Sequence, residues 1–395
     1  MSRIIVVGAG VAGARAAEAI AVRSPLRVVV VGAEPECPYQ RPLVSKELLL
    51  GQRLSDDETW LVTLERWQAL GIELRAGTSA VALRPEAQAL VLSDGEVMHF
   101  ERLVVATGST PRRLPVPGAA LPGVFTLRSM RDGQALAPRL STGRRVVVIG
   151  GGPLGLEIAE AARARGALVT VVERGESLLA RMVGPLLAPR LAEWLPLEGL
   201  TLRLGAGVRR VVGVEVAQGV ELTSGEVLEA DTVVMAVGVE PATGWLEGSG
   251  LLLERGAVRV DEHGQSSHPR VFAAGEVAAA WSPRLQRHLR VEHFGWAWQH
   301  GEVVGQNVAG GAVPFTASPG AGVTLQGHRL QVAGDVEGAV GCVIAPAGHG
   351  GRLAVLERDA QVSGVVAVDA PREFARARAE LGRPLTLLAD WVRAA

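Results

Sequence analysis

The sequence predicts an α/β protein built from two copies of one strand–turn–helix–strand unit, followed by a small α+β domain at the C-terminus. Two observations predict the repeated unit. A short β-branched run stands directly before each of two glycine-rich turns, at residues 8–13 and 150–155, and an alanine-rich helical stretch follows each turn. From about Val313 onward, glycines alternate with short strand-like runs, which predicts the separate C-terminal domain.

The elements follow one another in the same order in both units. Apart from Arg27, the second strand of the first unit is apolar, as a parallel strand buried on both faces should be. In the first unit we expect strands at 3–7 and 26–31 around a helix at 14–22, and in the second unit strands at 145–149 and 168–172 around a helix at 156–165. In the third region we expect strands at 329–332, 352–356 and 363–368 and a helix near 371–381.

Both turns have the spacing GxGxxG. In this pattern the first glycine allows a tight bend, the second lets the backbone approach a pyrophosphate, and the third lets helix and strand pack closely. An acidic residue about twenty positions later accepts hydrogen bonds from ribose hydroxyls. The pattern is filled by Gly8, Gly10, Gly13 and Glu34 in the first unit and by Gly150, Gly152, Gly155 and Glu173 in the second. The sequence therefore predicts two Rossmann-like dinucleotide-binding domains.

The acid of the second unit also indicates which nicotinamide cofactor binds. A carboxylate at the ribose repels a 2′-phosphate, so Glu173 favours NADH over NADPH. Arg174, directly after it, could soften that exclusion.

Composition excludes several other classes of protein. With 48% apolar and 21% charged residues in 395, the chain is typical of a globular protein with more than one domain. A net charge of −1 gives no electrostatic case for nucleic acid or an anionic membrane as partner, and no apolar run approaches the length of a spanning helix. The N-terminus leads straight into a strand, so we expect a cytoplasmic location. Cys37 and Cys342 have no metal-ligand or CxxC spacing, so we expect no metal site, and electrons must pass through a bound cofactor.

Several segments carry a family resemblance. Residues 37–46, CPYQRPLVSK, contain the only lysine of the chain, Lys46, and the only tyrosine, Tyr39. This segment resembles the PYxRPPLSK segment of NADH-dependent ferredoxin reductases of oxygenase and cytochrome P450 systems, which apoptosis-inducing factor and its bacterial relatives share. Further matches follow in the family's order: ATG at 106–108, GLE at 155–157, FAAGE at 272–276, RVEHF at 290–294 and the stretch 352–378.

The resemblance covers nearly the whole chain and implies a fold like that of the glutathione-reductase-like flavoproteins. The implied domains are an FAD-binding domain at 1–112 and 241–313, an NADH-binding domain at 113–240 and a C-terminal α+β domain at 314–395.

The resemblance also implies which residues bind each cofactor. At FAD it places Gly8, Gly10, Gly13, Glu34, Arg41, Lys46, Val81, Ala106, Thr107, Gly108, Gly275, Glu276, His293 and Phe294. At NADH it places Gly150, Gly152, Leu154, Gly155, Glu157, Glu173, Arg174, Arg181 and Gly238. Lys46, paired with Glu157 beside the isoalloxazine, would stabilise the negative charge of reduced flavin. Hydride transfer to flavin needs no protein base, so we interpret His293 and His300 as packing or polar-rim residues, and Trp296 and Trp298 as packing residues.

The function implied is transfer of electrons from NADH through FAD to a ferredoxin or redoxin. An NADH oxidase or quinone-type diaphorase and an NADH-sensing flavoprotein like apoptosis-inducing factor are the alternatives, and a monomer and a homodimer are both open. The chain departs from the family pattern at Ala33 in place of an acid, at Glu276 in place of aspartate, at Phe294 in place of tryptophan and in residues 314–319. The last two departures fall where the electron acceptor would approach.

Overall fold

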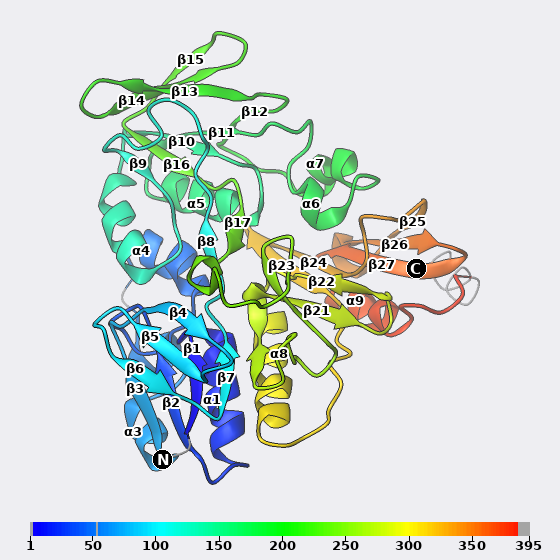
Figure 1. Cartoon of the computed structure of the whole chain (residues 1–395). Helices are drawn as coiled ribbons and strands as arrows, with labels where there is room; N and C mark the ends of the chain where they lie inside the picture. Colours follow the sequence, from blue (N-terminus) through cyan, green and yellow to red (C-terminus); the bar gives the residue numbers. More distant parts are fainter. Residues whose placement is uncertain (1–2, 53, 386–395) are drawn as a thin grey trace. The chain divides into compact units, whose positions relative to one another are not determined.

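The computed structural model describes residues 3–52 and 54–385 (Figure 1). Contacts along the chain group it into two compact units. Unit 1 comprises Met1–Pro42, Leu54–Thr110 and Val239–Ala317, and unit 2 comprises Leu43–Arg53, Pro111–Gly238 and Ser318–Ala395. Each unit contains a parallel sheet of the predicted kind, so the predicted α/β fold class is confirmed. The three-domain division stays a prediction, and its terminal stretches 1–2 and 386–395 lie outside the described residues.

Unit 1 is organised around a five-stranded parallel sheet with the order β20-β7-β1-β2-β3. Its central strand, β1, pairs in register with β2 on one side and β7 on the other. The strands are β1 (Arg3–Val7), β2 (Arg27–Val31), β3 (Ile72–Arg75), β7 (Arg102–Val105) and β20 (Val271–Ala273). Because the strands are parallel, their carboxyl ends meet at one edge of the sheet, where the first glycine turn also lies.

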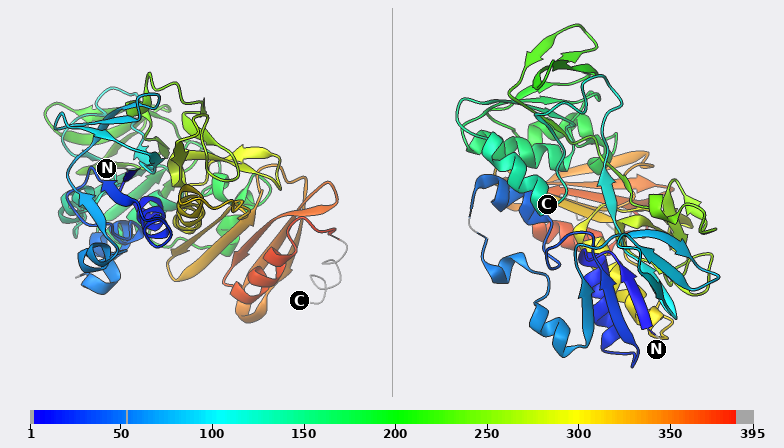
Figure 2. Two further views of the ribbon diagram at one scale, coloured as in Figure 1. Left: turned by 60° about the horizontal axis from the view of Figure 1, so that its bottom comes forward. Right: turned by 60° about the vertical axis from the view of Figure 1, so that its left-hand side comes forward.

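Two helices pack closely beside this sheet, α1 (Val11–Ala21) and α8 (Phe294–Val308) (Figure 2). The contact is tight because α8 presents glycine to the backbone of α1. A Cβ atom at Gly301 would lie 2.3 Å from the Ala12 carbonyl oxygen, and one at Gly305 would lie 2.6 Å from that of Ala16. The alanine-rich composition of α1 thus serves close packing of helix on helix as well as helix propensity.

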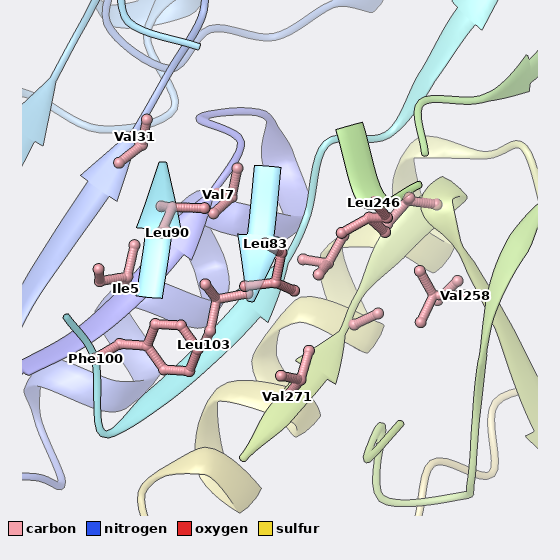
Figure 3. Close-up of a cluster of buried hydrophobic side chains, with 14 of the residues drawn as sticks. Ile5, Val7, Val31, Leu83, Leu90, Phe100, Leu103, Leu246, Val258 and Val271 are labelled. Atoms are coloured by element: carbon pink, nitrogen blue, oxygen red, sulfur yellow. The ribbon is translucent and has the colours of Figure 1, made fainter. Parts of the chain in front are cut away.

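The other face of the sheet is covered by short strands, which pair antiparallel except for the parallel pair β19 and β21. Ile5, Val7 and Leu103 of the parallel sheet face Leu83 and Leu90 of the antiparallel strands in a continuous apolar core (Figure 3). The covering strands are β4 (Ala80–Arg84), β5 (Ala89–Leu92), β6 (Val97–His99), β18 (Leu253–Glu254), β19 (Ala257–Val260), β21 (Ala278–Ser282) and β22 (Arg287–Leu289). The remaining elements of this unit are α2 (Asp56–Thr59), α3 (Leu64–Ala69), η4 (Gly244–Leu246), η5 (Gly275–Val277) and the pair β8 (Ser109–Pro111) and β17 (Val239–Pro241).

His300 lies in the interior of unit 1 with no exposed surface. Its Nδ1 accepts a hydrogen bond from the Gly275 N–H at 3.2 Å, and its ring stacks on Phe315 with centroids 4.6 Å apart. Burial lowers the pKa of the imidazole from 6.5 to about 4, because a charged ring there would lose its hydration. The interpretation of His300 as a packing residue therefore agrees with its surroundings.

We expect His300 to make unit 1 sensitive to acid. The folded state binds the proton more weakly than the unfolded chain, so the stabilisation is complete above pH 6.5 and is lost as pH falls toward 4. The predicted loss is about 3 kcal/mol, from about 1.4 kcal/mol for each pKa unit. Urea unfolding at pH 7 and pH 4.5, in the unaltered protein and in His300→Gln, measures it. The account is wrong if both proteins lose the same stability.

Unit 2 repeats the parallel arrangement, with the order β12-β11-β10-β16-β9. Its strands are β9 (Val124–Phe125), β10 (Arg145–Ile149), β11 (Leu168–Val172), β12 (Thr201–Arg203) and β16 (Thr232–Met235), and α5 (Pro153–Ala164) connects β10 to β11. A three-stranded antiparallel sheet adds β13 (Val208–Gly213), β14 (Ala217–Leu222) and β15 (Val227–Glu229). Short helices are η1 (Val44–Leu48), α4 (Met130–Leu136), η2 (Ala137–Arg139), α6 (Ala180–Val183), η3 (Ala188–Arg190) and α7 (Leu191–Trp194).

The C-terminal part of unit 2 is an antiparallel sheet with the order β23-β24-β27-β26-β25, on which α9 (Pro371–Ala379) packs (Figure 2). The strands are β23 (Gly320–Leu325), β24 (His328–Gly334), β25 (Gly341–Pro346), β26 (Arg352–Arg358) and β27 (Gln361–Val368), and η6 (Gly348–Gly350) precedes β26. The sequence predicted β24, β26, β27 and the helix, but not β23 or β25. Among the described residues, no helix is long and apolar enough to cross a membrane.

The two motif helices begin earlier than the sequence predicted. The predicted starts at residues 14 and 156 assumed that the third glycine of each motif still belongs to the turn. In the structure α1 begins at Val11 and α5 at Pro153, so Gly13 and Gly155 lie inside the first turn of each helix. These glycines are needed for close contact: a Cβ atom at Gly13 would stand 1.8 Å from the Gly8 carbonyl oxygen.

Candidate functional site

The first glycine turn lies at the carboxyl edge of the unit 1 sheet. Gly8 has φ +112°, and a Cβ atom there would stand 2.2 Å from the Ala106 carbonyl oxygen. Gly10 differs, because a Cβ atom there would meet nothing within 4 Å. Gly10 is also the N-cap of α1, with no side-chain cap and no acidic residue in the first turn. The turn therefore offers open space and unpaired helix N–H groups, which is the arrangement that receives a phosphate.

The second glycine turn, in unit 2, has the same construction. Gly150 has φ +115°, and its Cβ atom would stand 2.3 Å from the Ala236 carbonyl oxygen. A Cβ atom at Gly155 would stand 2.0 Å from the Gly150 carbonyl oxygen, but one at Gly152 would again meet nothing within 4 Å. Gly152 is the uncapped N-cap of α5, and half-buried Leu154 follows in the first turn of that helix. Packing within the protein thus explains Gly150 and Gly155 but not Gly152, whose surroundings leave room for a ligand.

We expect Gly152→Ala and Gly155→Ala to have different effects. Gly155→Ala forces a clash inside the fold, so it should lower the midpoint of thermal unfolding. Gly152→Ala should leave that midpoint within about 1 °C and weaken NADH binding about tenfold or more, because the methyl group enters the space open to a phosphate. Calorimetric titration with NADH together with thermal unfolding checks both. Unchanged affinity in Gly152→Ala would exclude this turn as the NADH site.

Glu34, the acid of the first glycine motif, accepts hydrogen bonds from the segment that follows it. The Tyr39 hydroxyl donates to Glu34 Oε2 at 2.6 Å, and the Arg41 guanidinium donates to Glu34 Oε1. Burial alone would lower the pKa of Arg41, but Tyr39 and Glu34 outweigh it, so the pKa lies above its ordinary value. Glu34 therefore fixes the chain at Tyr39–Arg41 next to the first glycine motif, and Arg41 remains charged there.

Two further segments reach the carboxyl edge of the unit 1 sheet. Ala106, Thr107 and Gly108 follow β7, and the Thr107 hydroxyl donates to the Ala242 carbonyl at 2.8 Å. Gly275 follows β20, and a Cβ atom there would stand 2.7 Å from the Ala12 side chain of α1. The Ser109 hydroxyl donates to Glu276 Oε2 at 2.6 Å, which joins the two segments. The structure thus brings these five predicted FAD residues to the first glycine turn.

The remaining predicted FAD residues of unit 1 are His293, Phe294 and Val81. His293 is the N-cap of α8, and its Nδ1 accepts from the Gly295 N–H at 3.2 Å. Burial lowers the pKa of His293, and Glu276 partly offsets this. Phe294 begins α8, with its ring 6.0 Å from that of Trp298. Val81 lies on the separate β4–β6 sheet, where it is 48% exposed.

In unit 2, Glu173 follows β11 beside the second glycine turn. Its Oε2 accepts from the Gly151 N–H and its Oε1 from the Gly175 N–H, both at 2.7 Å. Each oxygen keeps a further lone pair for a ribose hydroxyl. Arg174 is exposed next to it. Arg181 approaches Gly238, since a Cβ atom at Gly238 would stand 3.4 Å from Arg181 Nη1.

Lys46 lies on η1, a five-residue π-helical turn that contacts α4 and α5. Its Nζ is 3.6 Å from Oε1 of Glu157, which lies on α5. The Ser45 hydroxyl donates to the other oxygen, Oε2, at 2.6 Å. Burial raises the pKa of Glu157, and the hydrogen bond from Ser45 and the charge of Lys46 oppose the rise. The Lys46 side chain is 39% exposed, so its ammonium stays available to a ligand.

Sequence reasoning missed three polar residues that organise these sites: Ser45, Ser109 and the Tyr39 hydroxyl. For Ser45 and Tyr39 there was a signal, since both fall inside the segment CPYQRPLVSK. Ser109 had none, because its partner Glu276 is 167 residues away in the sequence.

With this geometry in view, comparison with known proteins is informative. A model of the pyridine nucleotide-disulphide oxidoreductase family matches residues 2–301. A benzene 1,2-dioxygenase system ferredoxin–NAD+ reductase subunit from Pseudomonas putida is 33% identical over 378 residues, which are 95% of this chain and 91% of that protein. The corresponding biphenyl dioxygenase component from Paraburkholderia xenovorans is 31% identical over 98% of this chain and 95% of that protein.

Solved structures agree with the sequence relatives. The ferredoxin reductase for the CYP199A2 system from Rhodopseudomonas palustris matches with a TM-score of 0.92 at 28% identity, covering 99% of this chain and 98% of that one. The reductase in a covalent putidaredoxin reductase–putidaredoxin complex matches with a TM-score of 0.89 at 26% identity, covering 98% and 96%. The chain therefore belongs to the pyridine nucleotide-disulphide oxidoreductase family, and its relatives there include ferredoxin–NAD+ reductases that it matches along nearly their whole length.

Proposed function

We propose that this protein is an FAD-dependent NADH:ferredoxin oxidoreductase, which takes electrons from NADH and passes them to a ferredoxin-type or redoxin-type iron–sulfur protein. The observation that carries the proposal is the pair of glycine turns, each with an open second glycine at an uncapped helix N-terminus. Two such turns in one chain fit one resident and one exchanging dinucleotide. The names of the full-length relatives support ferredoxin as the acceptor.

The residues of unit 1 fit FAD. The first glycine turn would hold the pyrophosphate on the N-terminus of α1, and Arg41 supplies a lasting positive charge nearby. Gly275 and Glu276, which follow β20 and are joined to the segment after β7 by the Ser109–Glu276 hydrogen bond, would complete the binding surface. Bound FAD accepts two electrons from NADH and releases them singly, which is what a one-electron iron–sulfur acceptor requires.

The residues of unit 2 fit NADH. The second glycine turn would receive the pyrophosphate, and Glu173, already oriented by two backbone N–H groups, would accept from the ribose hydroxyls. Its negative charge disfavours a 2′-phosphate. Lys46, whose ammonium is held by Glu157, would stabilise negative charge that develops on the reduced cofactor.

The titration of Glu157 should control this role of Lys46. Because burial raises the pKa of Glu157, the carboxylate should take up a proton at a pH above its ordinary 4.5 and release Lys46. We expect the rate of flavin reduction at saturating NADH to fall as pH drops through that pKa, and Glu157→Gln to lack this acid limb. The effect on stability has the opposite sign, since a raised pKa favours the folded state at low pH and that benefit is lost as pH rises. Stopped-flow reduction between pH 5 and 8 tests the expected fall in the rate of flavin reduction. An identical acid limb in the unaltered protein and in Glu157→Gln would contradict it.

Steady-state electron transfer tests the proposed function. The FAD-loaded protein is given NADH with a plant-type or oxygenase-type [2Fe–2S] ferredoxin, and ferredoxin reduction and oxygen consumption are both followed. Reduction that depends on the ferredoxin and outpaces oxygen consumption supports the proposal. Equal oxygen consumption with and without ferredoxin would instead identify an NADH oxidase. A long-lived complex of reduced protein with NAD+, together with a change in oligomeric state and no electron transfer, would identify an NADH sensor.

We keep the domain division as a proposal: FAD at 1–112 and 241–313, NADH at 113–240 and a third domain at 314–395. We also propose the cytoplasm as location, which is supported by Cys37 and Cys342 being free thiols, as is usual in reducing compartments.

A further inference from the structure

The Arg165 side chain bridges two backbone carbonyls of unit 2. Its Nε donates to the Leu140 carbonyl at 2.6 Å, and its Nη1 donates to the Leu49 carbonyl at 3.0 Å. Arg165 is the C-cap of α5, and Leu49 is the C-cap of η1, which carries Lys46. One guanidinium therefore ties the end of the Lys46 helix to the end of the helix that begins at the second glycine turn.

The end of η1 needs such a partner. The last carbonyls of any helix have no N–H partner within the helix, and they carry a partial negative charge that a cation offsets. Within this segment the Gln52 N–H is paired with the Glu47 carbonyl and the Gly51 N–H with that of Leu48. The Leu49 carbonyl is taken by Arg165. Gly51 lets the arginine approach, since a Cβ atom there would stand 2.8 Å from Arg165 Nη1.

The helix η1 is thus attached to α5 at two separated points. Glu157 holds its middle through Ser45 and Lys46, and Arg165 holds its end. Eight residues separate Glu157 from Arg165, which is about 12 Å along a helix axis at 1.5 Å per residue. Attachment at two points fixes the direction of η1, whereas attachment at one point would let it pivot about Glu157.

Packing against α4 leaves η1 little room. A Cβ atom at Gly133 of α4 would stand 2.6 Å from Leu48 Cδ2 and 2.8 Å from Val44 Cγ1. Figure 1 shows η1, in blue, next to α4. The Lys46 side chain is 39% exposed, so burial does little to fix its ammonium, whose position depends on Glu157 and on how η1 is held.

We propose that Arg165 is a positioning residue for Lys46, which sets the direction of η1 and through it the place of the ammonium. The proposal rests on the proposed role of Lys46 in reduction by NADH. Arg165 itself touches no reacting atom and acts only through η1.

The test compares Arg165→Met with Arg163→Met, which removes the same charge two residues earlier on α5, where the Arg163 side chain lies beside Gly199. Arg165→Met should slow flavin reduction at saturating NADH about tenfold and leave the dissociation constant of NADH within twofold, while Arg163→Met stays within twofold in both. Hydrogen–deuterium exchange of residues 44–52 in the FAD-loaded protein without NADH should be faster in Arg165→Met alone. Arg165→Lys, which keeps a donor at this place, should recover part of the reduction rate and part of the protection from exchange at residues 44–52.

A double variant separates positioning from general destabilisation. In a Lys46→Met background, Arg165→Met should cause no further slowing, because the group it positions is gone. A full tenfold further slowing, or unchanged exchange at 44–52, would overturn the proposal. If NADH fails to reduce even the unaltered protein, the proposed function falls, and the exchange measurement still decides whether Arg165 holds η1.

Discussion

Lys46→Met is expected to slow reduction of the bound flavin by NADH about 100- to 1000-fold, the usual effect of removing one group that stabilises developing charge. The methionine keeps much of the length of the side chain and removes the ammonium. NADH affinity should change little, because the proposed nucleotide contacts lie at the second glycine turn and Glu173 rather than at Lys46. Rapid-mixing measurements of flavin bleaching across NADH concentrations separate the limiting rate from the dissociation constant.

Two further variants show whether the slowing depends on the ammonium itself. Lys46→Arg keeps the positive charge but replaces a compact ammonium by a planar fork, so an intermediate rate is expected. Gln52→Met, an exposed position in the same segment, should behave as the unaltered protein. The role of Lys46 is refuted if Lys46→Met retains its limiting rate within threefold.

Glu173→Ala is expected to change the preference between NADH and NADPH by about 100-fold or more. Loss of a charged acceptor costs about 1.5–3 kcal/mol of NADH binding, which is about 10- to 100-fold in kcat/KM. Loss of the negative charge also removes repulsion of a 2′-phosphate, and exposed Arg174 is in place to attract it. Both changes shift the ratio of kcat/KM values in the same direction.

Controls separate recognition from damage to the turn, because Glu173 also accepts from the N–H groups of Gly151 and Gly175. Thermal unfolding reports that structural contribution. Glu176→Ala, an exposed acid three residues later, should leave the nucleotide preference unchanged. Adding Arg174→Ala to Glu173→Ala should abolish the gain with NADPH and leave the loss with NADH. A ratio that stays within threefold in Glu173→Ala would show that this acid does not discriminate.

The sequence alone predicted the fold well where the local pattern of residues determines the backbone conformation. The central strands β1, β10 and β11 have the bounds that the sequence predicted, because runs rich in β-branched residues have few alternatives once buried. The third glycine of each motif was misplaced for a physical reason. Glycine usually marks a turn, but at Gly13 and Gly155 it serves contact between a helix and the preceding turn, which no local pattern shows.

The site was predictable to the extent that it is encoded in contiguous motifs. Gly10 and Gly152 were predicted from spacing, and their open surroundings give that prediction a physical basis. The polar contacts that orient the motifs were not predictable in the same way. Ser109 reaches Glu276, and Arg165 reaches Leu49, across 167 and 116 residues of sequence, so these contacts exist only once the strands and helices are in place.

The central claim is that electrons enter from NADH and leave to an iron–sulfur protein. The most direct test reduces the FAD-loaded protein with one equivalent of NADH without oxygen and then mixes it with an oxidised [2Fe–2S] ferredoxin of an oxygenase system. We predict that the flavin absorbance returns at a rate that rises with ferredoxin concentration, while the ferredoxin bleaches in a ratio of two molecules per flavin. Reoxidation no faster with any such ferredoxin than with buffer would contradict the claim.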